Sequence, residues 1–281
     1  MNQKNSTTYL NRTTGRSHSR LMAISIFLLL SLFYTVSHAR TLNLIVQPIL
    51  DPKRSIEFYQ PLAEYLSKQT GEDIKIIAAV NFPAYWETMK KGKEYDIVMD
   101  AAHFTDFRRD RLGYTVLAKV PDTVSYSLVT DEEAMILDPE ELIGKPIATM
   151  SSPGLGGIRL NEMFPNPLRQ PIIMETPNSL AAVDKVKKGE AIAAIIPTPL
   201  LNSLEGLNTV TTTDPVPHVG FSVAPGVSKK LQESIKKALI EASKTEEGKK
   251  MLEAISFPQF VEANATIYDG QAALLDGVWG Y

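Results

Sequence analysis

Short apolar segments alternate with segments of helical spacing along most of the chain, and this alternation restricts the fold more than any other feature of the sequence. Strands and helices that alternate at this spacing form sheets of parallel strands with helices packed on both faces. We predict strands at 42–46, 74–79, 95–99, 114–120, 146–150, 172–175 and 191–196. We predict helices at 55–70, 82–91, 157–164, 179–188, 229–243 and 245–254, with short ones from His103 and at 138–142.

Two segments without this alternation, 121–130 and 209–223, divide the pattern into two sets. We interpret them as crossings between two α/β lobes, the second inserted into the first. The predicted first lobe comprises 40–123 and 218–281, and the predicted second lobe comprises 124–217. Ligands of open α/β sheets bind beyond the carboxyl ends of the strands, so two facing sheets predict a ligand cleft between the lobes that closes by a hinge.

The first 39 residues have the layout of a secretory signal peptide. Four basic residues precede the sixteen-residue apolar run 21–36, and Ser37-His38-Ala39 provides a small-x-small cleavage signal. The apolar run is shorter than the roughly 20 residues that a membrane-spanning helix needs. We therefore predict export to the periplasm with cleavage after Ala39, and an uncleaved N-terminal anchor is the alternative.

Charge and cysteine content restrict the partners and the cross-links of the exported chain. Without the four basic residues of the signal, 25 of the 29 Lys and Arg remain against 32 Asp and Glu, a formal charge of −7. This charge disfavours nucleic acid and anionic membrane surfaces as partners. The chain has no cysteine, so it forms no disulfide and carries no lipid-modified cysteine. We expect a monomer whose stability comes from its core.

The segment 148–157, Ala-Thr-Met-Ser-Ser-Pro-Gly-Leu-Gly-Gly, joins a predicted strand to the start of a predicted helix. The first N–H groups of a helix have no partner within it, and they carry the positive end of the helix dipole. Hydroxyls and glycines there let a small oxyanion approach the backbone closely, which makes Ser151, Ser152 and Gly154 candidate ligand-binding residues. The alternative is a serine that caps an ordinary strand-to-helix turn.

The sequence contains no motif typical of catalysis. It has no cysteine nucleophile, no Gly-x-Ser-x-Gly elbow, no His-Glu-x-x-His motif and no phosphate-binding loop ending in Gly-Lys-Ser/Thr. No base lies close in sequence to the serines at 151 and 152. We therefore predict a binding protein rather than an enzyme, with no cofactor and no resident metal.

Several further segments occur in a characteristic order. They are Tyr59–Leu66 with Thr70-Gly71, Lys91-Gly92 with Tyr95-Asp96-Ile97, Asp138 with Glu141–Lys145, Ser151-Ser152-Pro153-Gly154, and Asn178–Val183 before Lys188-Gly189. In this order the chain resembles type II periplasmic substrate-binding proteins, and more narrowly the phosphate/phosphite/phosphonate-binding family of ABC transporters. The resemblance covers nearly all of the chain after the signal. It implies a two-lobe α/β protein that closes on a small polar ligand and delivers it to an inner-membrane ABC permease.

The serine loop carries the ligand contacts that this resemblance implies. In that family the loop reads Ser-Thr-Ser-Gly, and its hydroxyls and N–H groups hold the phosphonate oxygens. The resemblance therefore implies that Ser151, Ser152 and Gly154 hold the ligand, while Pro153 replaces the third hydroxyl.

Two acidic residues depart from the family pattern. Asp100 stands where the family often has a tyrosine after the third strand, and Glu175 stands where some members have a histidine. A carboxylate about 4 Å from a phosphonate costs about 4 kcal/mol at an effective dielectric constant of 20. Asp100 and Glu175 would instead suit an amine or another cationic ligand, or a metal held together with His103.

These candidates also have interpretations that need no ligand. Asp100 can cap the helix that follows it, His103 can be a packed core residue, and Glu175 can face solvent at a strand end. Tyr59 and Tyr85 are candidates for the cleft wall because ligand pockets are largely apolar and aromatic, although helical spacing fits Tyr59 to the core equally well. We predict that the charged run at 106–111 forms a solvated face.

Together these features predict the periplasmic solute-binding component of an ABC-type uptake system. Its ligand is of the phosphonate or phosphate class by resemblance, and a cationic or amine ligand is the option that Asp100 and Glu175 raise. The main alternative is a periplasmic sensor that uses the same cleft and signals to a membrane receptor kinase.

Overall fold

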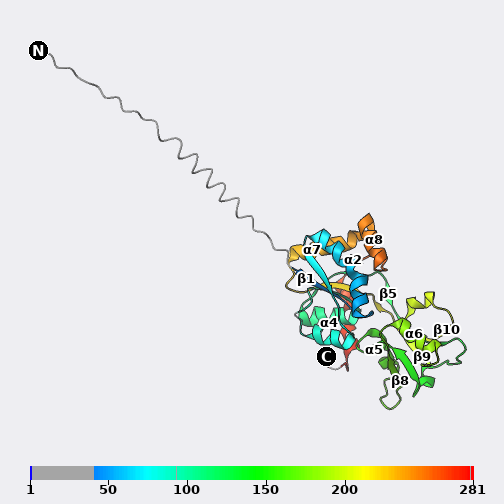
Figure 1. Cartoon of the computed structure of the whole chain (residues 1–281). Helices are drawn as coiled ribbons and strands as arrows, with labels where there is room; N and C mark the ends of the chain where they lie inside the picture. Colours follow the sequence, from blue (N-terminus) through cyan, green and yellow to red (C-terminus); the bar gives the residue numbers. More distant parts are fainter. Residues whose placement is uncertain (2–40, 93, 279) are drawn as a thin grey trace. The chain divides into compact units, whose positions relative to one another are not determined.

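The computed structural model describes Met1 and residues 41–92, 94–278 and 280–281, so the predicted signal peptide at 1–39 lies outside the described residues. Residues 41–281 contain two large mixed sheets with helices packed on both faces (Figure 1). In the described part of the chain, no helix combines the length and the apolar character needed to cross a membrane.

A six-stranded sheet contains the N-terminal strands and has the order β13-β4-β12-β3-β1-β2. Strands β1, β2, β3 and β4 run in one direction, while β12 and β13 pair antiparallel with their neighbours. The strands are β1 (Thr41–Val46), β2 (Asp73–Ile77), β3 (Ile97–Asp100), β4 (Thr115–Lys119), β12 (Gly220–Val223) and β13 (Val261–Glu262).

A five-stranded sheet contains the middle of the chain and has the order β10-β6-β9-β7-β8. Its strand β6 is antiparallel to both neighbours, whereas β7 pairs in parallel with β8 and β9. The strands are β6 (Tyr126–Asp131), β7 (Pro146–Thr149), β8 (Ile172–Glu175), β9 (Ala193–Pro197) and β10 (Leu207–Thr212). Most strands of each large sheet thus run in one direction, as predicted; β12 and the edge strand β13 are reversed in the six-stranded sheet, and β6 is reversed in the five-stranded sheet.

The chain passes from the six-stranded to the five-stranded sheet through β5 (Thr123–Val124) and returns through β11 (Val216–Pro217). These two short strands pair antiparallel in a sheet of their own. The predicted crossing at 209–223 is therefore right for β11 only, because β10 and β12 on either side of it belong to the two large sheets. The exact lobe boundaries stay a prediction.

Most of the described α-helices begin at a side-chain cap, whereas the N-cap residues of α4 and α5, which are Ala101 (not Asp100) and Gly154, provide none. In α2, the Asp51 side chain accepts a hydrogen bond from the Arg54 N–H at 3.0 Å, and Gly71 ends the helix in the left-handed conformation with φ of 76°. The α-helices are α2 (Pro52–Thr70), α3 (Phe82–Lys90), α4 (Ala102–Leu112), α5 (Leu155–Met163), α6 (Ser179–Lys187), α7 (Lys229–Glu241) and α8 (Glu246–Ala254). Short 3₁₀ helices are η2 (Pro139–Leu142), η3 (Thr198–Ser203), η4 (Ala242–Lys244), η5 (Ala265–Tyr268) and η6 (Gln271–Leu275).

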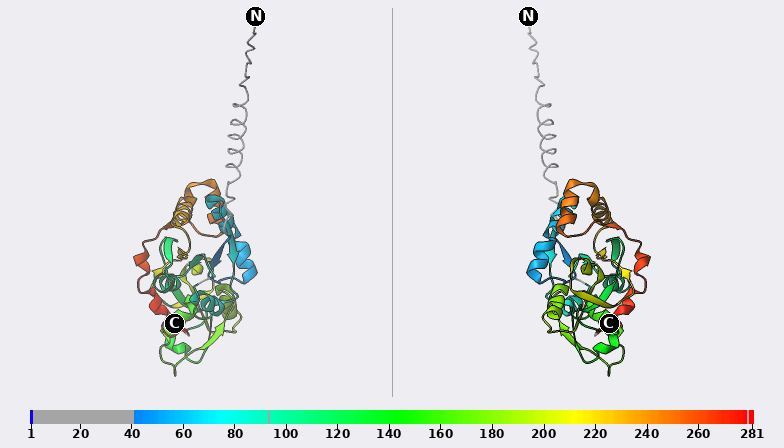
Figure 2. Two further views of the ribbon diagram at one scale, coloured as in Figure 1. Left: turned by 90° about the vertical axis from the view of Figure 1, so that its left-hand side faces the viewer. Right: turned by 90° about the vertical axis from the view of Figure 1, so that its right-hand side faces the viewer.

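Alternate residues of the strands enter separate cores on the two faces of each sheet, as the pleat of a strand requires. Leu44 packs in a core with α2, α7 and α8, whereas Ile45 packs in a core with α3, α4 and η6. Figure 2 shows the orange α8 beside the blue α2. On the five-stranded sheet, α5 covers one face and α6 the other.

The cores of the two sheets also meet each other. Met150 and Ile158, which flank the start of α5, are buried in the same cluster as Phe82 and Phe104 of α3 and α4. The start of α5 is therefore packed against helices of the six-stranded sheet.

Candidate functional site

The serine loop between β7 and α5 is built as predicted, but its groups face different surroundings. Gly154 caps α5, and its N–H donates to the Ser151 carbonyl at 2.9 Å. Ser151 lines a small cavity of about 90 Å³ that Phe82 also lines. Ser152 instead lines a separate surface pocket beside η6. A Cβ placed on Gly154 would lie 2.7 Å from the Phe82 ring, so this ring covers the start of the helix closely.

His103 attaches this loop to α4. Its ring is fully buried, and Nε2 lies 3.0 Å from the Pro153 carbonyl oxygen. A carbonyl can only accept, so Nε2 carries the proton, and Nδ1 is buried with no hydrogen-bond partner among the described residues. Burial lowers the pKa of His103 to about 4, which keeps the ring neutral near pH 7. His103 thus holds the loop against the six-stranded sheet.

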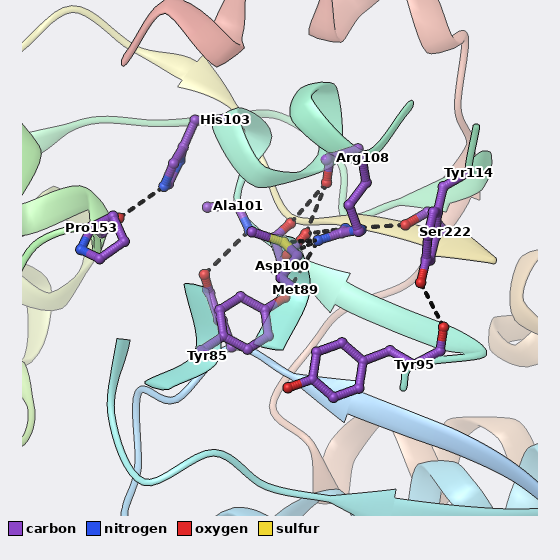
Figure 3. A network of polar contacts seen from close by, with 12 residues as sticks. Tyr85, Met89, Tyr95, Asp100, Ala101, His103, Arg108, Tyr114, Pro153 and Ser222 are labelled. Carbon is purple, nitrogen blue, oxygen red and sulfur yellow. Dashed lines mark hydrogen bonds and ion pairs between the residues drawn. The ribbon is translucent and has the colours of Figure 1, made fainter. Parts of the chain in front are cut away.

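Asp100, at the end of β3, lies at the centre of a buried network (Figure 3). Its two carboxylate oxygens accept hydrogen bonds from the two terminal nitrogens of Arg108, one of them 2.6 Å from Oδ1, in a bidentate ion pair. The hydroxyls of Tyr85 and Thr105 donate to the same carboxylate, the latter at 3.0 Å. Arg108 also donates to Ser222 Oγ at 3.1 Å. The carboxylate is therefore neutralised within the protein, and both charged side chains are fully buried.

The predicted solvated face at 106–111 is wrong at two positions, because Arg108 is fully buried and Asp106 is 1% exposed. Arg108 lies on the turn of α4 that faces β3, where Asp100 compensates its charge. The sequence signal for this buried pair is an acidic residue at a strand end followed eight positions later by an arginine. Many solvated helices have the same pattern, so it does not identify a buried pair.

Glu175, the other acidic candidate, does not join Asp100 and His103 in a cation site. Glu175 ends β8 with an exposed side chain. Within the described ranges, no group of three or more His, Cys, Asp or Glu side chains is arranged to hold a metal ion. Asp100 offers no free carboxylate to a cationic ligand, because Arg108 already forms an ion pair with it.

A cavity of about 540 Å³ lies between the two sheets and is lined by both. Its walls come from α2, the end of β1, β3, β6, the start of α6 and η3, together with both crossing strands. Most of the lining side chains are apolar, such as Met99, Leu155 and Phe257. A largely apolar cavity of this size with a few polar groups is typical of a small-molecule site.

Of the predicted site residues, Tyr59 lines this cavity. Tyr126 and His218 line it too, although we did not select them from the sequence. Tyr126 lies on β6 beside the first crossing, and His218 directly follows the second. Their one signal in the sequence is this position next to the crossings.

Two mixed sheets joined by paired crossing strands, with a cavity between them, define the type II periplasmic binding protein fold. The family model of the periplasmic substrate-binding protein of phosphonate ABC transporters matches residues 44–268. The chain belongs to this family. Proteins of this family are periplasmic, bind a small ligand and work with an ABC permease. The match to the family supports a solute-binding role and does not favour the sensor alternative.

Solved structures share this fold at low sequence identity. PhnD1 of Prochlorococcus marinus in complex with methylphosphonate has a TM-score of 0.72 at 14% identity, covering 85% of this chain and 98% of that one. A binding protein component of a Pseudomonas aeruginosa ABC phosphonate transporter gives 0.69 at 13%, covering 85% of each chain. The XAC2383 protein of Xanthomonas citri bound to ATP gives 0.68 at 14%, covering 85% and 99%. No curated protein matches the sequence.

Proposed function

We propose that this protein is exported, loses its signal after Ala39, and acts as a monomeric solute receptor in the periplasm. A small ligand binds between the two sheets, and the loaded protein delivers it to an inner-membrane ABC permease. The observation that carries this proposal is the cavity of about 540 Å³, which both sheets and both crossing strands line. A site built in this way is completed only when the two sheets approach each other.

The two crossing strands provide the hinge in this proposal. β5 and β11 are two residues each and pair only with one another, so small backbone changes there can reorient one sheet relative to the other. A ligand that contacts both sheets stabilises the closed arrangement by its greater affinity for it.

The surroundings of the serine loop support binding without catalysis. His103, which bonds to the loop, uses its one N–H on the Pro153 carbonyl, and burial keeps the ring neutral. No hydrogen bond joins the hydroxyls of Ser151 and Ser152 to a base among the residues that the structure describes. The formal charge of −7 after loss of the signal supports the absence of nucleic acid from its partners.

The phosphonate contacts implied by the family stay part of the proposal. PhnD1 was solved with methylphosphonate, and the corresponding contacts here would involve Ser151, Ser152 and Gly154. Replacing Ser151 and Ser152 together by alanine should then weaken methylphosphonate binding at least about tenfold, which is 1.4 kcal/mol. Unchanged affinity would remove the loop from the site.

Hinge closure is testable because the native chain has no cysteine. The substitutions Lys75→Cys on β2 and Lys188→Cys after α6 place one dye on each sheet, at side chains that are 62% and 60% exposed. Each lysine forms only a surface ion pair, so little stability is lost. The labelled protein is mixed with phosphate, phosphite, alkylphosphonates, carboxylates, amines and amino acids.

A ligand at about 100 times its dissociation constant stabilises the protein by about 2.7 kcal/mol and should also raise energy transfer between the dyes. Stabilisation by a ligand with unchanged energy transfer would contradict hinge closure. The absence of both effects for every compound in the panel would contradict the solute-binding assignment.

A further inference from the structure

The cavity between the sheets contains little formal charge. Among the described residues that line it, none is acidic and Arg54 alone carries a fixed charge. The Arg54 side chain is 74% exposed and lies 3.5 Å from Asp51, so it stands at the rim. Burial, and next the positive charge of Lys119, lower the pKa of His218, which keeps its ring neutral near pH 7. The lining therefore offers a cationic ligand no counter-ion.

Two tyrosines of this lining, one on α2 and one on β6, have hydroxyls without hydrogen-bond partners among the described residues. Tyr59 of α2 is 2% exposed and Tyr126 of β6 is 9% exposed. Neither phenol hydroxyl forms a hydrogen bond to any residue that the structure describes. Desolvation raises the pKa of Tyr59 and raises that of Tyr126 to about 12, so both stay protonated and can donate. Neither hydroxyl oxygen is among the fully buried polar atoms that lack a partner, so solvent or a ligand in the cavity can reach both of them.

Three more polar side chains of the lining present donors. In Gln47, Asn178 and His218, one polar atom already accepts from the backbone N–H of a neighbouring residue, at 3.2, 2.9 and 2.8 Å. A backbone N–H only donates, so these contacts fix the orientation of both amides and the tautomer of the ring. The remaining group is an NH₂ in Gln47 and Asn178, and the Nε2–H in His218. Each remaining group is a donor.

The start of α6 adds to this set. Ser179 and Leu180, its first two residues, line the cavity, and the first N–H groups of a helix have no partner within it. The helix dipole places partial positive charge there. The start of α6 and the two tyrosines therefore provide hydrogen-bond donors to the cavity. The helix start also makes the potential between the apolar walls weakly positive.

We infer that the ligand of this cavity is a small organic acid with an apolar body, whose carboxylate accepts hydrogen bonds from Tyr59, Tyr126 and the start of α6. This inference rests on the proposed function and specifies its substrate class. None of the described residues lining the cavity is a buried cation, and the buried Arg159, whose charge acts on Tyr126, lies outside the lining. A carboxylate therefore suits this donor set better than a phosphonate dianion does, because the second charge of the dianion gains less here than its desolvation costs. An apolar body gains about 0.8 kcal/mol for each buried CH₂ against the walls.

The inference is tested by titration calorimetry with compounds that separate the contribution of the polar head group from that of the apolar part of the ligand. The probes are 4-phenylbutyrate, acetate, 4-phenylbutylamine, phenylphosphonate and methylphosphonate. We expect 4-phenylbutyrate to bind tightest, at least roughly tenfold tighter than acetate, which lacks the body, and than the amine, which lacks the acceptor. Tighter binding of methylphosphonate or of the amine than of 4-phenylbutyrate would overturn the inference while leaving the proposed function in place. The inference would also be overturned if the protein closes on other solutes but does not bind 4-phenylbutyrate.

Conservative variants show whether the tyrosine hydroxyls take part. Tyr59→Phe and Tyr126→Phe should each weaken 4-phenylbutyrate binding about tenfold, because each removes a hydrogen bond to a charged acceptor. Tyr65→Phe is the matched control: it lies on the same helix as Tyr59, and its hydroxyl donates to the Ala238 carbonyl at 2.9 Å, away from the cavity. Equal affinity of all three variants and the native protein would overturn the assignment of the carboxylate to these hydroxyls.

Discussion

The serine loop and the cavity between the sheets both carry hydroxyls without a hydrogen-bond partner among the described residues, but the protein packs the two regions differently. At the loop, His103 donates to the Pro153 carbonyl, and the Phe82 ring covers Gly154. At the cavity, the hydroxyls of Tyr59 and Tyr126 have no partner among the described residues. The sequence points to the loop as a binding site more clearly than to the cavity, whereas the structure points more clearly to the cavity. A hydroxyl without a partner marks a binding site where the fold also leaves room for a ligand, about 540 Å³ in the cavity against about 90 Å³ beside Ser151, and the sequence alone does not reveal this.

The largest expected effect comes from the buried ion pair between Asp100 and Arg108. Asp100 follows Met99, which lines the cavity, and precedes the helix that carries His103. Arg108→Met leaves the Asp100 carboxylate buried without its counter-ion, which should lower the free energy of unfolding by about 3–5 kcal/mol. Urea denaturation measures this change. Arg111→Met on the exposed end of the same helix is the control, and equal losses in the two variants would contradict the buried-pair assignment.

The sequence predicted local structure well because its signals are local. Helix α2 follows from Asp51 and Gly71, and the predicted strands from 42 to 196 correspond to observed strands within a few residues. The insertion of β12 between β3 and β4 was not predicted, because pairing between distant segments leaves no local pattern.

The candidate site was predicted less completely than the fold. The serine loop exists where expected, and Tyr59 lines the cavity. The burial of Arg108 depends on a tertiary contact with Asp100, and the pairing of Tyr59 with Tyr126 around one cavity depends on how the two sheets face each other. Neither relation can be read from residue spacing.

The close packing of the loop predicts the second-largest effect. In Gly154→Ala the added Cβ would lie 2.7 Å from the Phe82 ring and 2.9 Å from the Ser151 carbonyl oxygen. Overpacking of this kind should cost about 1–3 kcal/mol of unfolding free energy. Gly226→Ala is the matched control, since a Cβ there meets nothing within 4 Å. If both variants are equally stable by thermal or urea denaturation, the loop is looser than its packing indicates.

A smaller effect should appear as a pH dependence carried by His103. Its pKa is about 4 in the folded protein, below the usual 6.5, so between these values the unfolded chain binds a proton that the folded chain does not. Stability therefore falls as the pH falls, by about 1 kcal/mol between pH 7 and pH 5.5. His103→Gln keeps a donor for the Pro153 carbonyl but removes this titration. Urea midpoints at the two pH values should separate less in the variant, and an unchanged separation would show that His103 does not titrate as its burial predicts.

The smallest expected differences concern ligand affinity, measured for the serine loop and for the cavity between the sheets with the same set of variants. The alanine replacement of Ser151 and Ser152 should leave 4-phenylbutyrate affinity unchanged, because neither serine lines the tyrosine cavity. Tyr59→Phe should weaken 4-phenylbutyrate binding about tenfold and leave the affinity for methylphosphonate unaltered. Calorimetry with both ligands and both variants shows whether the regions act separately. If the serine variant weakens both ligands alike, the loop and the cavity form one site, and the carboxylate contacts the start of α5 as well as that of α6.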